Sequence, residues 1–515
     1  MNETYLLGID IGTSACKAIL IDAGGAVVGA TVREYPLHTP RAGWAEQNPE
    51  DWWQAVCMGV GALLRDTGIS TAAIRGIGLS GQMHGLTPLD EHGMVLRPAI
   101  LWNDQRTGAQ CAWATQRAGG LTELLKFTNN PMLTGYTGGK ILWLRDEEPA
   151  LYARLRHAIN PKDYIRYRLT GVIASEVSDA SGTGLFDVRA RRWSKALLKR
   201  LDIPMDILPP VYESAVISGA LSEVAAAATG LPAGLAVAGG GGDAVVQTTG
   251  MGLITPGVLG ITIGTAGILA MGLDRFYQNR EGRLQIFCNN SPDTWHVMGV
   301  NLVGGGALRW LRDHLSEAQR NEAEARGVDA YTHLSEIAAH APPGARGLLF
   351  LPYMIGERCP YPDPAARGGF IGLALHHGRA DLTRAVLEGV VYNLRDIFEL
   401  IRPMGISAQE IRSSGGGSVS PLWRQIQADV FQCPVTTVTG SAVGGAYGAA
   451  LVAGVGVGVW ADLRDAVGVL KKESETLPNP ANRAVYEDLY GVYKSLYASL
   501  KPSFDALAEI QGRFA

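Results

Sequence analysis

Two copies of one short pattern carry the residues best suited to phosphate chemistry. The segments 7–13 and 259–265 share six of their seven residues, and each is an apolar strand that runs into Gly-Thr. Such a turn leaves backbone N–H groups and a hydroxyl free to face an anion, so two of them predict a polyphosphate held from both sides. Only the first copy has a carboxylate, Asp10 in place of Thr262, and a carboxylate can hold a hydrated divalent cation. We therefore interpret the chain as a duplicated nucleotide-binding protein with its metal on the first half.

The position of Asp10 favours a magnesium site. It stands at the end of an apolar strand, two residues before a Gly-Thr turn, where a magnesium ion that keeps most of its waters can bridge ATP phosphates. The alternative is a strand-ending Asp that caps a turn, and for Thr13 and Thr265 the alternative is an ordinary turn hydroxyl. The matched second copy favours metal and phosphate.

Asp243 is the candidate general base. It follows four consecutive glycines, 239–242, which allow a ligand to approach the backbone closely and present the acid at a domain junction. An acid here can accept a proton from a sugar hydroxyl as that oxygen attacks phosphorus, which is worth roughly 10²- to 10⁴-fold in rate. The alternative is a flexible glycine hinge with an incidental acid.

A third glycine run, Gly415–Gly417, follows the strand-like segment 410–412 and precedes Ser418. It would let a flat base or ribose lie against the backbone, with a helix opening just beyond. A structural turn explains the run equally well. No G-x-x-x-x-G-K-[ST] pattern occurs, so a P-loop is excluded as the ATP site.

A fourth group of side chains suits a polyol. Gln82, Met83 and His84 occupy the loop after a short apolar strand, and the segment 102–104 with Arg106 adds further hydrogen-bonding and apolar groups. On spacing alone, a lone loop histidine is more often simply solvated.

The elements that position these residues predict an α/β fold built twice. In the first half we expect an antiparallel meander with strands at 5–10, 16–21 and 26–32. A helix capped by Asn48 should follow from residue 49 onward, and then a buried parallel strand at 74–79. In the second half we expect strands at 257–263, 267–271, 285–288 and 296–300 and helices at 305–315 and 380–401. A duplicated βββαβα unit with a cleft between the copies is the architecture of the actin-like, ribonuclease-H-like ATPases. We place the domains at 1–248 and 249–515, with peripheral helices from about Asp462.

Composition excludes several classes of protein. The chain has 515 residues, 47% of them apolar and 18% charged, which suits two globular domains. A net charge of −4 argues against nucleic acid or an anionic membrane surface as a partner. Six scattered cysteines without a C-x-x-C pair indicate neither disulfides nor zinc and favour the cytoplasm. The uncharged stretches 244–273 and 430–461 are broken by glycine, so we expect sheet and close-packed helix there and no membrane span.

Several of these segments together resemble the FGGY carbohydrate kinase family, and within it the xylulose kinases. The matching segments are Gly8–Ser14, Trp44–Trp53, Gly81–Gly85, Ile100–Asp104, Pro161–Tyr164, Gly240–Asp243, Phe350–Tyr353, Gly356–Arg358 and Gly415–Gly417. They span about residues 4 to 455 in the family's order.

The resemblance implies ATP and Mg²⁺ as cofactors, a small sugar as substrate and a homodimer. It assigns Asp243 as the catalytic base and Asp10 as the magnesium-associated acid. Met83, His84 and Asp243 would touch the ketose, with Gln82 and Asp104 beside them. The residues implied for the nucleotide are Gly12, Thr13, Ser14 and Lys17 at the first phosphate turn, Gly264 and Thr265 at the second, and Gly415, Gly416, Gly417 and Ser418 by the adenosine.

Two departures from the family pattern bear on the acceptor. Ala244 follows Asp243 where many xylulose kinases have a polar residue that helps bind sugar, so one hydrogen bond is missing or comes from another group such as Gln247. Ala266 stands where the family often has Ser. We expect D-xylulose to be converted to D-xylulose 5-phosphate, with another ketose, a polyol or a sugar acid as the alternative acceptor. An actin-like or chaperone-like ATPase is the alternative from another class, and the Gln82–His84 loop argues against it.

Overall fold

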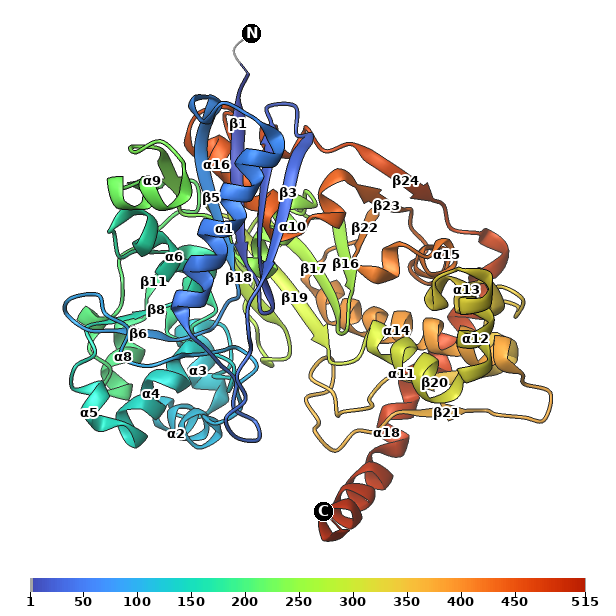
Figure 1. The fold of residues 1–515 in the computed structure, drawn as a ribbon. Helices are drawn as coiled ribbons and strands as arrows, with labels where there is room; N and C mark the ends of the chain where they lie inside the picture. Colours follow the sequence, from blue (N-terminus) through green and yellow to red (C-terminus); the bar gives the residue numbers. More distant parts are fainter. Residues whose placement is uncertain (1–2, 515) are drawn as a thin grey trace. The chain divides into compact units, whose positions relative to one another are not determined.

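Two seven-stranded mixed sheets form the framework of the chain, which the computed structural model describes from residue 3 to residue 514 (Figure 1). The chain divides into two units. The first contains the chain up to Thr255 together with Gly272–Val297 and Val443–Lys471. The second contains Pro256–Met271, Met298–Ala442 and the chain from Lys472 onward. The predicted α/β class is confirmed.

The bounds of the elements are as follows. The first sheet has the order β13-β14-β5-β1-β2-β3, with β15 also beside β5: β13 (Ile217–Ala220), β14 (Ala236–Ala238), β5 (Ile74–Gly81), β1 (Tyr5–Ile11), β2 (Ala15–Asp22), β3 (Val27–Glu34) and β15 (Gly241–Gly242). The second sheet has the order β18-β19-β17-β16-β22-β23-β24: β18 (Gln285–Cys288), β19 (Trp295–Asn301), β17 (Gly267–Leu273), β16 (Val258–Ile263), β22 (Glu410–Ser414), β23 (Val435–Val438) and β24 (Lys472–Thr476). Two-stranded ladders pair β4 (Glu46–Gln47) with β7 (Ala99–Ile100), β6 (Thr87–Leu89) with β8 (His157–Ile159), β9 (Ser175–Glu176) with β12 (Val211–Tyr212), β10 (Phe186–Asp187) with β11 (Arg192–Trp193) and β20 (Leu349–Leu351) with β21 (Gly369–Ile371).

The helices divide between the two units. Those of the first unit are α1 (Pro49–Thr67), α2 (Gly108–Ala118), α3 (Leu121–Thr128), α4 (Thr137–Glu147), α5 (Pro149–Tyr152), α6 (Pro161–Thr170), α7 (Val177–Ser181), α8 (Lys195–Leu201), α9 (Glu223–Thr229), α10 (Asp243–Gly250), α16 (Gly445–Gly456) and α17 (Leu463–Val467). Those of the second unit are α11 (Gly305–Leu315), α12 (Glu317–Arg326), α13 (Ala330–Ala338), α14 (Arg379–Ile401), α15 (Pro421–Phe431) and α18 (Arg483–Phe514).

The predicted meander and buried parallel strand of the first half are confirmed. β1 pairs antiparallel with β2, β2 pairs antiparallel with β3, and β1 pairs parallel with β5. Asp22 stabilises the β2–β3 turn, because its Oδ1 accepts hydrogen bonds of 2.9 Å from the backbone nitrogens of Gly24 and Ala26. β1 and β5 lie in the interior of the sheet and are largely buried, as expected of strands that are covered on both faces.

Helix α1 covers one face of this sheet, over β2 and β3. It begins as the sequence predicts: the side chain of Asn48 accepts a hydrogen bond from Glu50 N at 3.2 Å, and Pro49 occupies the first helical position. It ends at Gly68, whose φ of 63° is a left-handed conformation. Its buried residues, among them Trp52 and Val56, join the core of the first unit.

Helix α16 packs on β1 and β5 at very short range. A Cβ at Gly8 would lie 1.9 Å from the carbonyl oxygen of Ala446, and one at Gly78 would lie 1.8 Å from that of Ala449. Only glycine fits at these two strand positions, because such separations are far inside van der Waals contact. The uncharged stretch 430–461 is thus explained as close-packed helix and sheet. No helix within residues 3–514 combines the length and apolarity needed to span a bilayer.

The second sheet repeats the central pattern of the first. β16 pairs antiparallel with β17 and parallel with β22, as β1 does with β2 and β5. The predicted hairpin, the strands at 285–288 and 296–300 and the helices at 305–315 and 380–401 are confirmed with bounds that differ by at most two residues. The prediction of helices throughout the stretch from Asp462 is wrong for β24, which pairs antiparallel with β23 at the edge of the sheet. In β24 the charged residues Lys472, Glu473 and Glu475 are exposed, and exposed charged side chains are typical of an edge strand.

Candidate active site

The parallel pairing of β1 and β5 brings Asp10 beside Ser80. The two residues are register partners, and Ser80 Oγ donates a hydrogen bond of 2.6 Å to Asp10 Oδ1. The equivalent pair in the second sheet is Thr262 and Ser414, whose hydroxyls lie 2.7 Å apart. The duplicated position therefore carries a negative charge in the first sheet only.

The positive charge near Asp10 does not fully offset the effect of burial on its pKa. Burial raises its pKa, while the hydrogen bond from Ser80 and the nearby Lys17 lower it in part. Lys17 is the partner of Asp10 across β1 and β2, and its Nζ donates to the carbonyl oxygen of Val443 at 3.1 Å. Ser14, in the turn between the two strands, is exposed.

The first Gly-Thr turn is held rigidly by groups from three directions. Gly12 N donates to Ala15 O at 3.1 Å, which closes the turn. Trp102 Nε1 donates to Thr13 Oγ1 at 2.8 Å, and Gln47 Nε2 donates to Thr13 O at 2.7 Å. The turn is thus ordered before any ligand arrives, which lowers the cost of binding an anion there.

Asp243 is the first residue of α10, directly after β15, which pairs with the end of β5. Because Gly241 is the register partner of Ser80, the sheet delivers Asp243 close to Asp10. Burial raises the pKa of Asp243 to about 7, the negative charge of Asp10 adds to this shift, and backbone N–H groups of Ala244 and Met83 oppose it. A carboxylate with a pKa near neutrality is suited to exchange protons with a substrate.

His84 is fixed in the loop after β5, with an unusual backbone φ of 70°. Its Nδ1 lies 2.6 Å from the carbonyl oxygen of Gly182, so Nδ1 carries a proton and donates it to that oxygen. The imidazole stacks on Tyr136, with ring centroids 4.5 Å apart, and lies 6.0 Å from Phe287. Met83 is buried beside it. The arrangement sets a polar ring within an apolar wall, as a sugar site requires.

Gln82 and Asp104, the other two residues assigned to the sugar, are buried and engaged with protein groups. Gln82 Nε2 donates to Gln47 Oε1 at 2.9 Å. Asp104 makes a bidentate ion pair with Arg106, with bonds of 2.9 and 2.7 Å, and also accepts from Ala45 N at 2.7 Å. In this structure both side chains stabilise the loops around the site.

The donor set near Asp10 suits a largely hydrated Mg²⁺. Asp10 and Asp243 place two carboxylates together, and Mg²⁺ is usually held by one or two carboxylates together with waters and substrate phosphates. A Cβ at Gly445 would lie 2.3 Å from Ser80 Oγ and 3.0 Å from Asp10 Oδ1, so the first residue of α16 keeps this space open. Within residues 3–514 no group of three His, Cys, Asp or Glu forms an all-protein metal cage.

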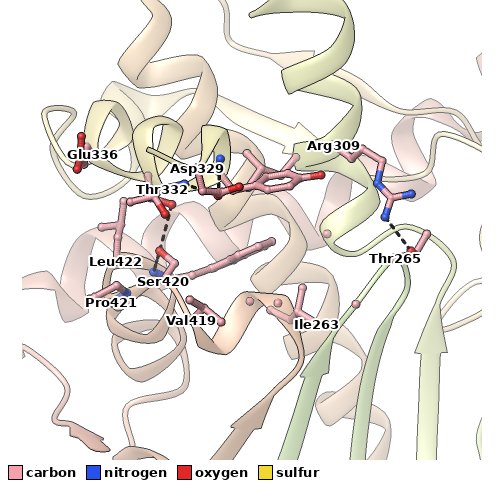
Figure 2. Close-up of a pocket in the computed structure, with 18 residues that line it drawn as sticks. Ile263, Thr265, Arg309, Asp329, Thr332, Glu336, Val419, Ser420, Pro421 and Leu422 are labelled. Atoms are coloured by element: carbon pink, nitrogen blue, oxygen red, sulfur yellow. Dashed lines mark hydrogen bonds between the residues drawn. The ribbon is translucent and has the colours of Figure 1, made fainter. Parts of the chain in front are cut away.

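The second unit has its own pocket, with a volume of about 810 Å³ (Figure 2). It is lined by Ile263, Gly264, Thr265, Gly305, Leu308, Arg309, Asp329, Tyr331, Thr332, Ser335, Glu336, Gly416, Gly417, Val419, Ser420, Pro421, Leu422 and Trp423. Figure 2 shows Arg309 reaching Thr265, where its Nη2 donates to Oγ1 at 3.4 Å. The predicted nucleotide residues Gly264, Thr265, Gly416 and Gly417 therefore share one cavity.

The second Gly-Thr turn rests on the N-terminus of α11. The backbone nitrogens of Gly304 and Gly306 donate to Thr265 O at 2.8 and 3.0 Å, and Gly305 N donates to Gly264 O at 2.7 Å. The run Gly304–Gly306 is a visible sequence signal for this contact, but no role was predicted for it. The contributions of α11 and α13 to the pocket were also missed: Arg309 follows that run by one helical turn, and Tyr331 lies far from any glycine motif in the sequence.

The glycine run after β22 forms a tight connection to α15. Gly415 has a φ of 73°, and a Cβ at Gly417 would lie 2.6 Å from Ile263 Cβ. Ser418 Oγ donates to Gly415 O at 2.8 Å. The glycine run thus packs its backbone directly against Ile263 at the end of β16, and together they form one wall of the pocket.

Comparison with known proteins agrees with this arrangement. The model for the N-terminal domain of the FGGY family of carbohydrate kinases matches residues 5–250, and that for its C-terminal domain matches residues 259–457. The chain is 37% identical over 504 residues to a xylulose kinase of Bacillus subtilis (strain 168), which covers 98% of each. A solved xylulose kinase from Rhodospirillum rubrum has a TM-score of 0.89 and 32% identity, over 97% of this chain and 100% of that one. A solved gluconate kinase from Lactobacillus acidophilus has a TM-score of 0.90 and 26% identity, over 98% and 100%.

The fold and these matches define an ATP-dependent sugar kinase with a duplicated actin-like, ribonuclease-H-like fold. The chain belongs to the FGGY family of carbohydrate kinases. Its likeness to xylulose kinases extends over nearly the whole length of both proteins. The alternative of an actin-like or chaperone-like ATPase is not favoured.

Proposed function

We propose that this kinase transfers the γ-phosphoryl group of ATP to a terminal hydroxyl of a ketopentose, D-xylulose in particular, and forms D-xylulose 5-phosphate. The observation that carries the proposal is the position of Asp243 at the start of α10, beside Met83 and close to Asp10, with a pKa near 7. Full-length similarity to a xylulose kinase supports the choice of sugar.

Asp243 acts as the general base. Its carboxylate is held by the backbone N–H groups of Ala244 and Met83 and takes the proton of the attacking hydroxyl as that oxygen bonds to phosphorus. Because burial raises its pKa to about 7, the carboxylate is a stronger base than an exposed aspartate and is still ionised in part at neutral pH.

His84 orients the sugar. With Nδ1 committed to the carbonyl of Gly182, Nε2 is the ring atom that we assign to a hydrogen bond with a sugar hydroxyl. Met83, Tyr136 and Phe287 provide apolar surface for the C–H faces of the sugar. Gln82 and Asp104 complete the sugar-side assignment by shaping the loops around it.

Two groups of residues take the nucleotide. Gly12, Thr13, Ser14 and Lys17 serve the phosphates on the first unit, while Gly264, Thr265, Gly415, Gly416, Gly417 and Ser418 serve the phosphates and adenosine on the second. Mg²⁺, when bound, neutralises phosphate charge, and Asp10 would hold it. Transfer requires both groups to engage the same ATP. A cytoplasmic, homodimeric enzyme completes the proposal; the six free thiols agree with a reducing compartment.

Another acceptor is the second candidate, because of Ala244. This residue offers the sugar no side-chain hydrogen bond, and the chain also has the gluconate kinase fold at a TM-score of 0.90. Gln247 lies one helical turn after Asp243 on the same face of α10 and is partly exposed, so its amide can replace the missing contact.

The test is a panel of acceptors with Mg-ATP and coupled detection of ADP. D-xylulose, D-ribulose, glycerol and gluconate are compared by kcat/KM, with Asp243→Asn as the control that lacks the general base. We expect D-xylulose to lead. Negligible phosphorylation of D-xylulose beside a strong alternative acceptor would overturn the choice of sugar, and ADP formation that ignores every sugar would overturn the kinase assignment for this site.

A further inference from the structure

Glu176 at the start of α7 is a buried carboxylate that has no ion-pair partner among residues 3–514. Glu176 is fully buried, and each of its oxygens accepts two hydrogen bonds. Oε1 accepts from Ser178 Oγ and Asp179 N, both at 2.7 Å, and Oε2 accepts from Ser178 N at 2.8 Å and Ser214 Oγ at 2.9 Å. Four donors compensate the buried charge and fix the short helix α7 in place.

Ser178 also binds β15, the strand that directly precedes Asp243. A hydroxyl has one hydrogen, and Ser178 donates it to Glu176, so its oxygen must accept from its other neighbours. Gly242 N donates to it at 3.0 Å and Asn290 Nδ2 at 3.3 Å. The residue immediately before Asp243 is therefore tied to Ser178 through its only backbone donor.

The other end of α7 fixes His84. Gly182 directly follows the helix, and its carbonyl oxygen accepts the Nδ1 hydrogen bond of the imidazole. A Cβ at Gly182 would lie 2.6 Å from the imidazole and 2.8 Å from Met83 Cε, so His84 and Met83 pack tightly against the backbone of Gly182. The five-residue helix α7 and the glycine that follows it thus contact both His84 and β15, the strand that directly precedes Asp243.

We propose that Ser178 is a positioning residue for the phosphoryl transfer: anchored by Glu176, it sets the separation of Asp243 from His84. This inference rests on the proposed function, in which these two side chains flank the sugar. Ser178 does not touch substrate. It acts by holding Gly242, and hence the carboxylate, where the attacking hydroxyl lies.

The chain provides a matched control three residues away. Ser175 is as buried as Ser178, but its Oγ has no hydrogen-bond partner within residues 3–514. Ser178→Ala removes the tie to Gly242, Ser178→Thr keeps the hydroxyl, and Ser175→Ala removes a buried hydroxyl from the same segment without touching the network.

The first measurement is the steady-state kinetics of the full-length variants, with melting temperatures to match folded protein. For Ser178→Ala we expect kcat/KM for the sugar to fall about tenfold to a hundredfold, since misplacement of a reacting group by about 1 Å has effects of that size. KM for ATP stays within about twofold of wild type, since no residue of α7 lines the pocket that we propose for adenosine. Ser178→Thr recovers most of the loss, and Ser175→Ala matches wild type.

The second measurement needs no substrate. Amide hydrogen exchange of the apo-protein should accelerate over residues 240–244 in Ser178→Ala and remain unchanged there in Ser175→Ala. Kinetics of Ser178→Ala that equal those of Ser175→Ala, or unchanged exchange over 240–244, would overturn the positioning role. If the wild type phosphorylates no sugar, the proposed function fails separately, and the exchange result alone decides whether Ser178 holds this strand.

Discussion

Ser80 donates a 2.6 Å hydrogen bond to Asp10 across the parallel pair β1 and β5, and Ser414 meets Thr262 at the same place in the second sheet. The backbone register is conserved between the two copies while the charge is not. The two copies thus have similar turns at the same place in their sheets, and the single difference between them puts a carboxylate in the first copy only. The testable consequences concern those acids and the groups that hold them.

Replacement of Asp243 by Asn should separate catalysis from stability. Loss of the general base lowers kcat by about 10²- to 10⁴-fold. The folded-state pKa of Asp243, about 7, lies above that of the unfolded chain, so its contribution to stability is complete below about pH 4 and is lost as the pH rises through 7. Asn removes this loss, and we expect the variant to be more stable than wild type at pH 8, by about 1–3 kcal/mol. Urea unfolding at pH 5 and pH 8 measures it; equal stability changes at both pH values would contradict the argument.

The pH dependence of the wild-type enzyme should report the same group. Because the base must be ionised and burial raises its pKa to about 7, kcat/KM for the sugar should fall about tenfold per pH unit below neutrality. Rates measured from pH 5 to pH 9 in buffers of constant ionic strength test this. The residual activity of Asp243→Asn is the control, and its kcat/KM should not show this fall below neutrality. A wild-type profile that stays flat down to pH 5 would exclude Asp243 as the base.

Substitution of Gly445 by Ala should damage the acid pair directly. The new Cβ would meet Ser80 Oγ at 2.3 Å and Asp10 Oδ1 at 3.0 Å, so either α16 or the carboxylate must move. We expect a destabilisation of about 1–3 kcal/mol and a loss of at least about tenfold in kcat. Gly491→Ala in α18 is the matched control, because no atom lies within 4 Å of its added Cβ, and it should leave activity unchanged and raise stability by up to about 1 kcal/mol.

Replacement of Asp104 by Asn distinguishes a structural role from sugar binding. Asp104 and Arg106 form a bidentate pair with almost no solvent exposure, and breaking a buried pair costs about 3–5 kcal/mol. We expect a large fall in melting temperature, with a sugar KM within a few-fold of wild type at a temperature where the variant is folded. Glu123→Gln, which breaks the exposed pair with Lys126, should cost less than about 1 kcal/mol. A raised sugar KM with unchanged stability would show instead that Asp104 binds the substrate.

Much of the fold could be predicted because its signals are local. The meander, the Asn48 cap and the strand that ends at Ser80 each depend on residues adjacent in sequence. The strand prediction failed at β24, because charged residues on an edge strand have the composition of an exposed helix. Turn glycines such as Gly264 and Gly417 could be selected from the sequence because close backbone approach has a clear signature, and both line one pocket.

The supporting residues of the site could not be predicted in the same way. Glu176 and Ser178 are buried polar residues whose partners lie as far away as Gly242 and Asn290, and nothing in their own segment shows where those donors come from. Arg309 likewise reaches the Thr265 turn from a helix that begins some forty residues later. Asp104 showed the opposite limit: its residue type suited a sugar ligand, but the ion pair in which Arg106 engages both of its oxygens could not be predicted.

The packing of α16 also determines when the protein can fold. Gly8 and Gly78 lie directly against the backbone of Ala446 and Ala449, so a helix encoded near the end of the chain covers one face of β1 and β5, which belong to the first sheet to be synthesised. Domains generally fold as units while they emerge from the ribosome. Here the first sheet cannot bury that face until residue 456 of 515 has been made, and the nascent chain must keep its apolar strands from aggregating for most of the time that translation takes.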